Sequence, residues 1–454
     1  MKKLKSKFIH IFVLTVFITA GCDGLLDINP EQSIDEEIAL STSDNVEAVL
    51  VGAYNALSDD DLLGGQLLFE PDLLADNPVT NEVQWTGTFE EPEQIWRKDI
   101  QVENGQVAQT WIAAYNAINL TNNVLSALDV VDADIRDRVE GEALFIRGMI
   151  YFNLLKLYAL PYSSGNINTN LGVPIITTPT SEISEANEVP RETVEAGYQQ
   201  VLEDLQAAEG LLPQANGIYA SAPVVAAILS RVHLQMGEYD LARQAADRVI
   251  SSGNYALTPT YEEAFNRTSN SSEDIFSMQV SEQDGANSMN LFYATSEFGG
   301  RGDILVRPPH IALYEVGDDR LSLFYDDTTA TGKWKNQFGN VGVVRLAEMY
   351  LTRAEANFRE GAPFVGDDPI NDLNAIRGRV NLPLYNAPTD FDLDDILLER
   401  KLELMFEGQL LHDLKRTQTD VGNISYNSGQ ITYPIPQREL DVNPNLEQND
   451  YYEQ

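Results

Sequence analysis

A single cysteine, Cys22, stands in the 454 residues of this sequence. A chain with one cysteine cannot form an internal disulfide, so the packing of its core has to hold the fold together. Hydrophobic residues make up 43% of the chain, which is enough for a large core at this length. The sequence therefore predicts a well-packed globular fold rather than a small cross-linked one.

The residues before Cys22 indicate export and lipidation. The first seven residues hold four lysines and no acid, residues 8–17 are almost entirely apolar, and Ala20-Gly21 precede the cysteine. This is the layout of a bacterial secretion signal. It resembles the bacterial lipobox, in which the cysteine takes a lipid and the preceding peptide is cleaved. We expect residues 1–21 to be removed and acyl chains on Cys22 to hold the chain to a membrane. The alternative is an ordinary secreted protein without the lipid.

The charge balance narrows the partners. Without residues 1–21 the chain keeps 26 basic side chains against 70 acidic ones, a formal charge of −44. A polyanion of this strength is repelled by DNA, RNA and anionic lipid headgroups, so we expect no nucleic-acid partner. The lipid, and not a basic patch, then has to provide the contact with the membrane.

Apolar residues recur at spacings of three and four along much of the chain, which predicts an all-α dominated fold. Helix–turn–helix units with small residues where the helices approach, as around Gly237, predict a tetratricopeptide-like scaffold of helix pairs with long ligand-binding loops and a few short strands. The predicted helices cover residues 43–57, 107–122, 135–158, 190–213, 221–237, 241–250, 345–359, 371–379 and 393–416.

Two segments of different composition interrupt the helices, near residues 59–105 and 281–310. Both are rich in Asp, Asn and Gly yet contain aromatic residues. Long loops inside a compact domain are usually functional, so we expect ligand binding there. No linker separates the helical segments, which predicts a single domain over residues 22–454.

Several short motifs resemble those of the SusD/RagB family of bacterial nutrient-binding lipoproteins, and they follow the family order along the chain. They begin with Leu-Leu-Asp-Ile-Asn-Pro at residues 25–30, just after Cys22. Further matches lie at residues 142–147, 172–175, 344–356, 373–379, 399–408, 413–416 and 434–439.

The resemblance implies a helical fold with four tetratricopeptide-like helix pairs and a ligand site built from loops. It implies a surface-exposed, lipid-anchored position on the outer membrane and a SusC-like TonB-dependent transporter as partner. Members capture oligosaccharides, or in some cases peptides, and are not catalytic. We expect no cofactor.

A late acidic cluster offers a competing, catalytic interpretation. Glu399, Glu403 and Glu407 share one helix face at spacings of four, with His412 and Asp413 nearby, so they could hold a metal or act as an acid–base pair. The other interpretation is a structural network of ion pairs, which we favour because arginines are interleaved through these motifs. The candidate partners are Arg345, Arg353, Arg377, Arg400 and Arg416. The sequence therefore predicts no catalytic residue and no metal site.

The loops supply the candidate glycan site. Trp85 and Trp96 lie in a polar stretch with Asp76, Asn77 and Asn81. A flat indole matches the apolar face of a sugar ring, while amide and carboxylate groups bind its hydroxyls. The alternative is that both tryptophans fold inward for stability. Further candidates of the same kind, Tyr293 and Phe298, come from the second loop segment.

Three function classes stay open at this stage. A glycan-binding lipoprotein that serves a transporter is the preferred one, with a marine polysaccharide such as a β-glucan as the suggested ligand. A peptide-binding member of the same family is the second. A surface glycoside hydrolase is the third, and it needs two carboxylates about 5–9 Å apart in an open cleft.

Overall fold

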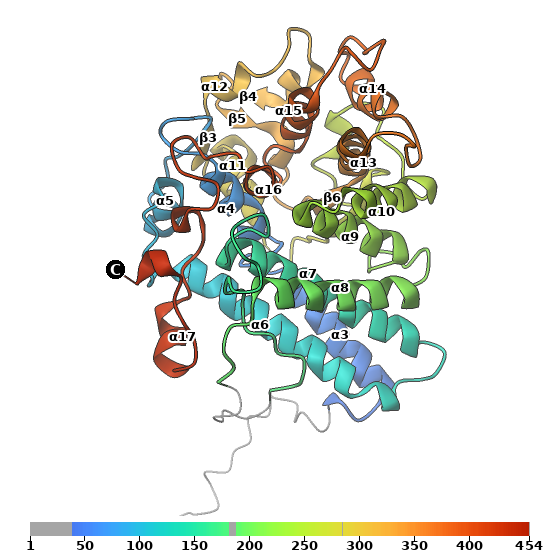
Figure 1. Cartoon of the computed structure of the whole chain (residues 1–454), viewed down its shortest axis with the longest axis vertical. Coiled ribbons are helices and arrows are strands. Elements are labelled where there is room, and N and C mark those ends of the chain that lie inside the picture. The colour runs from blue at the N-terminus through green and yellow to red at the C-terminus, as the bar shows by residue number, and fades with distance from the viewer. Residues whose placement is uncertain (1–38, 181–187, 284, 454) are drawn as a thin grey trace, which may run out of the picture.

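The computed structural model describes residues 39–180, 188–283 and 285–453 (Figure 1). Cys22 and the predicted signal segment lie outside the described residues. None of the helices within these ranges combines the length and the apolarity that crossing a bilayer requires.

A stack of eight helices forms the scaffold of the described chain, and each helix packs against the next one in sequence order. Together they make four consecutive helix pairs (Figure 1), so the predicted tetratricopeptide-like array is confirmed. The helices are α3 (Ser43–Leu57), α6 (Gly105–Ser126), α7 (Arg136–Tyr158), α8 (Val194–Leu211), α9 (Ala222–Met236), α10 (Tyr239–Ser251), α13 (Leu346–Glu360) and α14 (Pro369–Arg379).

Local sequence explains where these helices start and stop. Pro223 lies in the first turn of α9, where its missing N–H costs nothing. Gly237 ends the same helix with a φ of +77°, a left-handed conformation that favours glycine. The N-cap of α3 is Thr42, whose hydroxyl accepts the Asn45 N–H at 3.3 Å. The helix itself spans Ser43–Leu57, so the predicted bounds of 43–57 are confirmed.

The predicted last helix over residues 393–416 is wrong, because the structure breaks it into α15 (Leu393–Leu404) and α16 (Leu410–Arg416). Phe406 and Gly408 take left-handed conformations at the break, with φ of +66° and +74°. A Cβ at residue 408 would lie 2.7 Å from the backbone of Leu68, so only glycine permits this approach. The apolar periodicity continues across the break, which is why the pattern alone did not reveal it.

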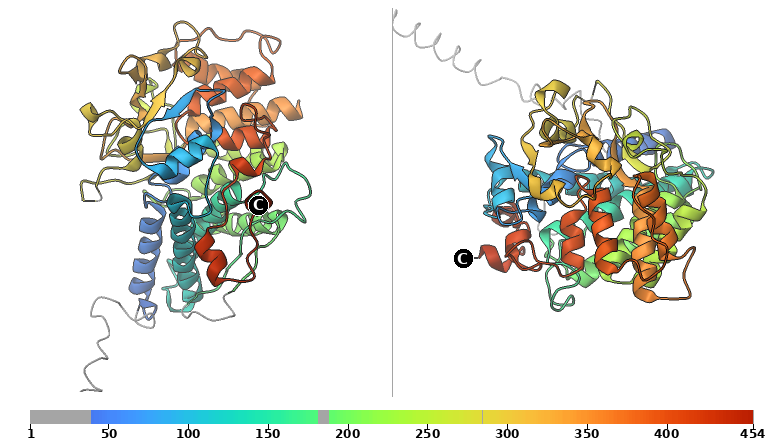
Figure 2. Two further views of the ribbon diagram at one scale, coloured as in Figure 1. Left: turned by 90° about the vertical axis from the view of Figure 1, so that its left-hand side faces the viewer. Right: turned by 90° about the horizontal axis from the view of Figure 1, so that it is seen from above.

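Two inserted segments lie between helices of the stack, one between α3 and α6 and one between α10 and α13. They correspond to the predicted loop-rich regions, but the first is not loop alone, since it contains a helix whose residues are all buried. The shorter helices of the described chain are α4 (Gln66–Ala75), α5 (Glu90–Arg97), α11 (Ser288–Tyr293), α12 (Pro308–Ile311) and, near the C-terminus, α17 (Gln437–Val442). Figure 2 shows most of these inserted elements gathered above the upright helices α3 and α6.

Short antiparallel strand pairs connect the inserted segments to one another and to the scaffold. Strand β1 (Val83–Trp85) pairs with β3 (Ile304–Val306), which joins the two loop-rich segments across more than 200 residues of sequence. The other pairs in the described residues are β2 (Asp274–Met278) with β6 (Val341–Arg345) and β4 (Phe324–Tyr325) with β5 (Ala330–Thr331). Because β1 and β3 pair, candidate residues from both segments come to the same end of the molecule.

Candidate functional site

The structure buries both loop tryptophans, so the expectation that they are exposed is wrong. Trp85 is 3% exposed in β1, and its ring packs on Phe292 with centroids 5.6 Å apart. Trp96 is 9% exposed in α5, and its indole N–H donates to the Val83 carbonyl oxygen at 3.0 Å. Their polar sequence neighbours suggested an open loop, but the pairing of β1 with β3 turns this segment into a layer of the core. The structure thus follows the inward-folded alternative.

Asp76 and Asn77 are also buried, and they shape the turn that leads into β1. The Asp76 carboxylate accepts the backbone N–H groups of Glu82 and Val83 at 3.1 and 2.9 Å. Asn77 donates its amide to the Val421 carbonyl oxygen at 2.8 Å. Their hydrogen-bonding groups are therefore already occupied by the protein. Asn81, in the same turn, is half-buried with a φ of +49°.

The two candidates from the second loop segment have different surroundings. Tyr293 is fully buried, and its hydroxyl donates to Asp72 at 3.2 Å. Phe298 is half-buried at the surface and packs edge-on against Tyr325 with centroids 5.3 Å apart. The Nζ of Lys335 lies above both of these rings, 5.0 Å from the first and 4.3 Å from the second. Phe298 is thus the candidate aromatic residue that keeps part of its ring accessible.

A second ring and cation pair lies in the same region. Phe89 is 42% exposed just before α5, and the guanidinium group of Arg301 lies 4.4 Å from its ring centroid. Arg301 is three residues from Phe298, and its Nη2 donates to the Thr88 hydroxyl at 3.3 Å. Each of the two ring and cation pairs therefore has one member, Phe298 or Arg301, on the segment that follows α11. We call these residues the aromatic loop surface: Phe89, Phe298, Arg301, Tyr325 and Lys335.

This surface combines aromatic rings with hydrogen-bonding groups, which is the combination that the sequence analysis expected around Trp85 and Trp96. Partly exposed rings offer apolar faces and edges for a sugar, and the two cations carry N–H donors for hydroxyl groups. Phe89, Tyr325 and the two cations were missed as candidates because the argument favoured tryptophan. The polar run Thr86-Gly87-Thr88 before Phe89 was the available signal that the ring would reach solvent.

The acidic cluster forms a buried network of ion pairs with arginines. Arg345 pairs with Glu403 and Glu407, and Arg377 pairs with Glu399, as predicted. The other predicted partners bind carboxylates outside this trio: Arg353 binds Asp247 and Asp372, Arg400 binds Glu348 and Asp413, and Arg416 binds Glu355 and Asp413. Sequence reasoning missed Arg320, Arg379 and Lys333, which also bind the trio.

Electrostatics keeps Glu403 and Glu407 of this network ionised. Burial alone raises the pKa of Glu407, but Arg345 and Lys333 outweigh it and lower that pKa below its ordinary value. Burial likewise raises the pKa of Glu403, and the neighbouring guanidinium groups, Arg379 first, lower it. The carboxylates of Glu403 and Glu407 are therefore charged, paired and enclosed, which is the state of structural ion pairs rather than of a proton donor in a cleft. Burial raises the pKa of Glu399, although Arg320 and Arg377 pair with it.

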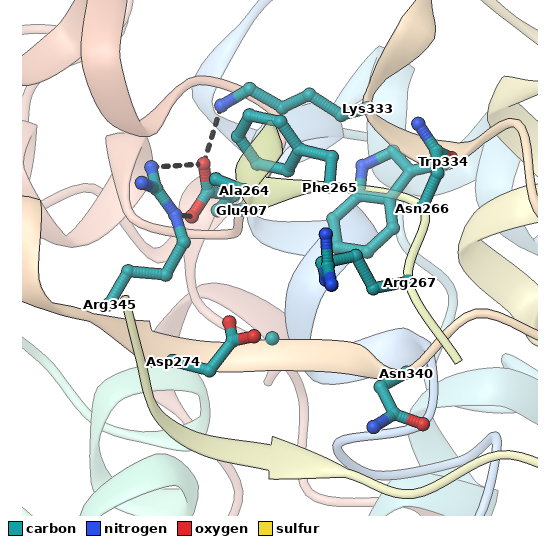
Figure 3. Close-up of a pocket in the computed structure, with 11 residues that line it drawn as sticks. Ala264, Phe265, Asn266, Arg267, Asp274, Lys333, Trp334, Asn340, Arg345 and Glu407 are labelled. Carbon is teal, nitrogen blue, oxygen red and sulfur yellow. Dashed lines mark hydrogen bonds and ion pairs between the residues drawn. The ribbon is translucent and has the colours of Figure 1, made fainter. Parts of the chain in front are cut away.

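A narrow pocket opens beside this network (Figure 3). Arg345, Lys333 and Glu407 line it on one side, while Asp274 and Arg267 lie towards the other. Its cavity volume is about 20 Å³, which holds one or two water molecules. A sugar does not fit between these carboxylates, so the pocket lacks the open cleft that the hydrolase alternative needs. Nowhere in the described ranges do three or more His, Cys, Asp or Glu side chains gather as a metal ion would require.

Comparison with known proteins identifies the family of the chain and supports its helix-pair fold. Residues 25–234 match a family model described as "Starch-binding associating with outer membrane", and residues 320–431 match the model of the SusD family. The chain belongs to the SusD/RagB family. A SusD-like protein of Formosa agariphila is 24% identical over 99% of both chains. The starch-binding protein SusD of Bacteroides thetaiotaomicron is 33% identical over 30% of this chain and 28% of its own. A crystal structure of a SusD superfamily protein from the same species superposes with a TM-score of 0.79 and 26% identity, over 90% of this chain and 99% of that one.

In this SusD/RagB protein the family motifs coincide with the buried ion pairs and not with the aromatic loop surface. The motif at residues 344–356 supplies Arg345 and Arg353, and the motif at residues 399–408 supplies the glutamate trio. Such motifs identify the scaffold, because the ion pairs connect its helices. The aromatic loop surface lies in the inserted segments between the helices of the scaffold.

Proposed function

We propose that the protein captures glycans at the aromatic loop surface. Support comes from the family, whose model is described as starch-binding, and from the relative named as a starch-binding protein. The observation that carries the proposal is the position of Phe298 and Phe89. Both are partly exposed rings with a cation beside them, on segments that β1 and β3 bring together.

Charge favours a neutral glycan. The two cations of this surface are already engaged, since Arg301 pairs with Asp303 at 2.6 Å and Lys335 lies over two rings. The rest of the chain carries a large excess of acid. A uronate or sulfate polymer would meet repulsion from this field, whereas an uncharged chain would not.

The proposed position in the cell rests on the predicted signal segment, residues 1–21, and on Cys22. We propose that lipid on Cys22 holds the protein on the outer surface of the outer membrane, and that it passes the glycan to a SusC-like TonB-dependent transporter. The acidic surface supports this mode of attachment, because it leaves the lipid as the membrane contact. A peptide ligand remains the alternative within the same family.

Binding calorimetry on Phe89→Ala and Phe298→Ala tests the proposal, with maltoheptaose, laminarihexaose and a mixture of tripeptides as probes. We expect one neutral oligosaccharide to bind the wild type, and each variant to bind it about tenfold more weakly, which corresponds to about 1.4 kcal/mol of lost contact. Thermal melts should change little, because both rings are at the surface.

Phe364→Ala is the matched control, since Phe364 is 40% exposed and lies outside the aromatic loop surface. It should bind the oligosaccharide like the wild type. If the Phe89 and Phe298 variants bind as tightly as the control, the glycan contacts another surface. Binding of the tripeptides alone would replace the glycan proposal with the peptide alternative.

A further inference from the structure

A second pocket shares no residue with the aromatic loop surface. It is formed where the end of α3, the segment before α9 and strand β2 meet. Its cavity volume is about 100 Å³, five times that of the pocket beside the ion network. Pockets that enclose a drug-sized ligand measure roughly 300–1,000 Å³. This one therefore suits a single ring and not a length of polymer.

The walls of this pocket are aromatic and aliphatic. Tyr54 and Tyr219 pack against each other with centroids 4.8 Å apart and a tilt of 52°. Tyr54 is held in place because its hydroxyl accepts the Ala220 N–H at 3.0 Å. Val51 and Ile218, also lining the pocket, are 42% and 47% exposed. A folded protein that leaves two large aliphatic side chains this open beside a tyrosine pair has an apolar surface ready for contact.

One polar group without a partner belongs to a residue that lines the same pocket. Ser277 is 3% exposed, yet its hydroxyl makes no hydrogen bond within the described residues. A buried hydroxyl without a partner destabilises the folded protein, so a ligand that reaches it and supplies a partner recovers that loss. Asn55 lines the pocket as well, with an exposed side chain. Hydroxyl and amide groups next to an aromatic face are the combination that fits a sugar ring.

We propose that the Tyr54–Tyr219 pocket is a second carbohydrate site that takes one pyranose ring of a glycan. The ring stacks on Tyr219 and its hydroxyls bind Ser277 and Asn55. An aliphatic side chain of a peptide would fill the apolar walls but leave the Ser277 hydroxyl unsatisfied, so the chemistry favours the sugar. The inference shares with the proposed function only the class of ligand. Two sites on one chain raise the avidity for a long glycan without any new contact at the first.

Ligand-detected NMR tests this site, with methyl glycosides of glucose, galactose and mannose as probes at millimolar concentration on the mature chain. At least one pyranoside should bind the wild type. Tyr219→Ala should weaken that binding at least fivefold by removing the stacking face. Ser277→Ala should also weaken it, while leaving the thermal melt unchanged or higher, because the removed hydroxyl has no partner in the free protein.

Matched variants separate this site from the first one. Tyr451→Ala is the control for Tyr219→Ala, since Tyr451 is 41% exposed and packs on Tyr452 at 5.0 Å. It should bind the pyranoside normally, and so should Phe298→Ala if the two sites are independent. Tyr219→Phe keeps the ring and should keep most of the binding, which guards against a folding defect in the alanine variant.

Three results would contradict this inference and leave the proposal for the aromatic loop surface unaffected. One is the absence of any pyranoside signal with the wild type. The second is equal binding by wild type and Tyr219→Ala. The third is competition for the pocket by isobutanol together with no effect of Ser277→Ala, which would mark it as an apolar contact. Loss of pyranoside binding in Phe298→Ala alone would assign the signal to the aromatic loop surface instead.

Discussion

The guanidinium group of Arg345 holds the carboxylate of Glu407 by two parallel hydrogen bonds, Nε to Oε2 and Nη2 to Oε1, both 2.8 Å long. Arg345 ends strand β6, and Glu407 lies in the break between α15 and α16. Lys333 donates to the same carboxylate from a third segment. The pair therefore ties the end of the second inserted segment, at β6, to the break between α15 and α16, and this break places Glu407 beside Arg345.

Removing the charge of Glu407 should destabilise the fold. Glu407→Gln leaves Arg345 and Lys333 buried without their full partner, and breaking a buried ion pair costs about 3–5 kcal/mol. Urea unfolding should show the loss as a lower midpoint. Glu262→Gln, at an exposed position, is the control and should unfold like the wild type. A midpoint for Glu407→Gln equal to that of the control would contradict the structural role of the network.

The loop tryptophans should behave as core residues. Trp85→Ala and Trp96→Ala each remove a buried indole, and truncating a large buried aromatic costs about 3–5 kcal/mol. Trp96→Phe should cost less, because it keeps the ring packing and loses only the hydrogen bond to Val83. Thermal melts measure all three. Melting temperatures like that of Phe89→Ala would show that the tryptophans are exposed in solution.

Stability should fall as the pH rises from about 4.5 to 8 because of a buried acid on α4, Glu70. Burial raises the pKa of Glu70 from 4.5 to about 8, so in the folded state this carboxyl keeps its proton at neutral pH. An unfolded chain releases that proton above its ordinary pKa. The folded state is therefore fully favoured below about pH 4.5 and loses this contribution as the pH rises towards 8.

Glu70→Gln removes this titration. The variant should match the wild type near pH 5 and melt at a higher temperature near pH 8, because the amide needs no proton. Its Tyr433 partner can still donate its hydroxyl hydrogen bond to the amide oxygen. Melting curves from pH 5 to pH 9 provide the measurement, with Glu297→Gln as the exposed control. An identical pH profile for Glu70→Gln and wild type would refute the assignment.

The lipid anchor should depend on Cys22 alone. Cys22→Ser removes the sulfur that takes the lipid, while the described core begins later in the chain. We expect the variant to fold, to keep its glycan affinity and to leave the membrane fraction. Fractionation of cells that lack the transporter partner provides the measurement. Retention of the variant in the outer membrane would argue against lipidation at this residue.

Local rules predicted most of the scaffold. The helices of the stack appear where apolar spacing, prolines and Gly237 placed them, since each of these signals acts within one or two turns of chain. The same rules failed at residues 405–409. There the apolar pattern is continuous, and only the contact of Gly408 with Leu68, 340 residues earlier, requires the chain to turn. The glycine is visible in the sequence, but the contact that makes the chain turn there is with a distant segment and is not.

The candidate site shows the same difference between what local sequence predicts and what long-range contacts decide. The sequence by itself determined the family, the helix-pair architecture, the paired state of Glu403 and Glu407, and the two segments that carry aromatic side chains. Tertiary structure decided which aromatic side chains stay accessible, because the pairing of β1 with β3 buries Trp85 and Trp96 and leaves Phe89 and Phe298 near solvent. Exposure depends on what a distant segment covers, and residue type alone does not carry that information.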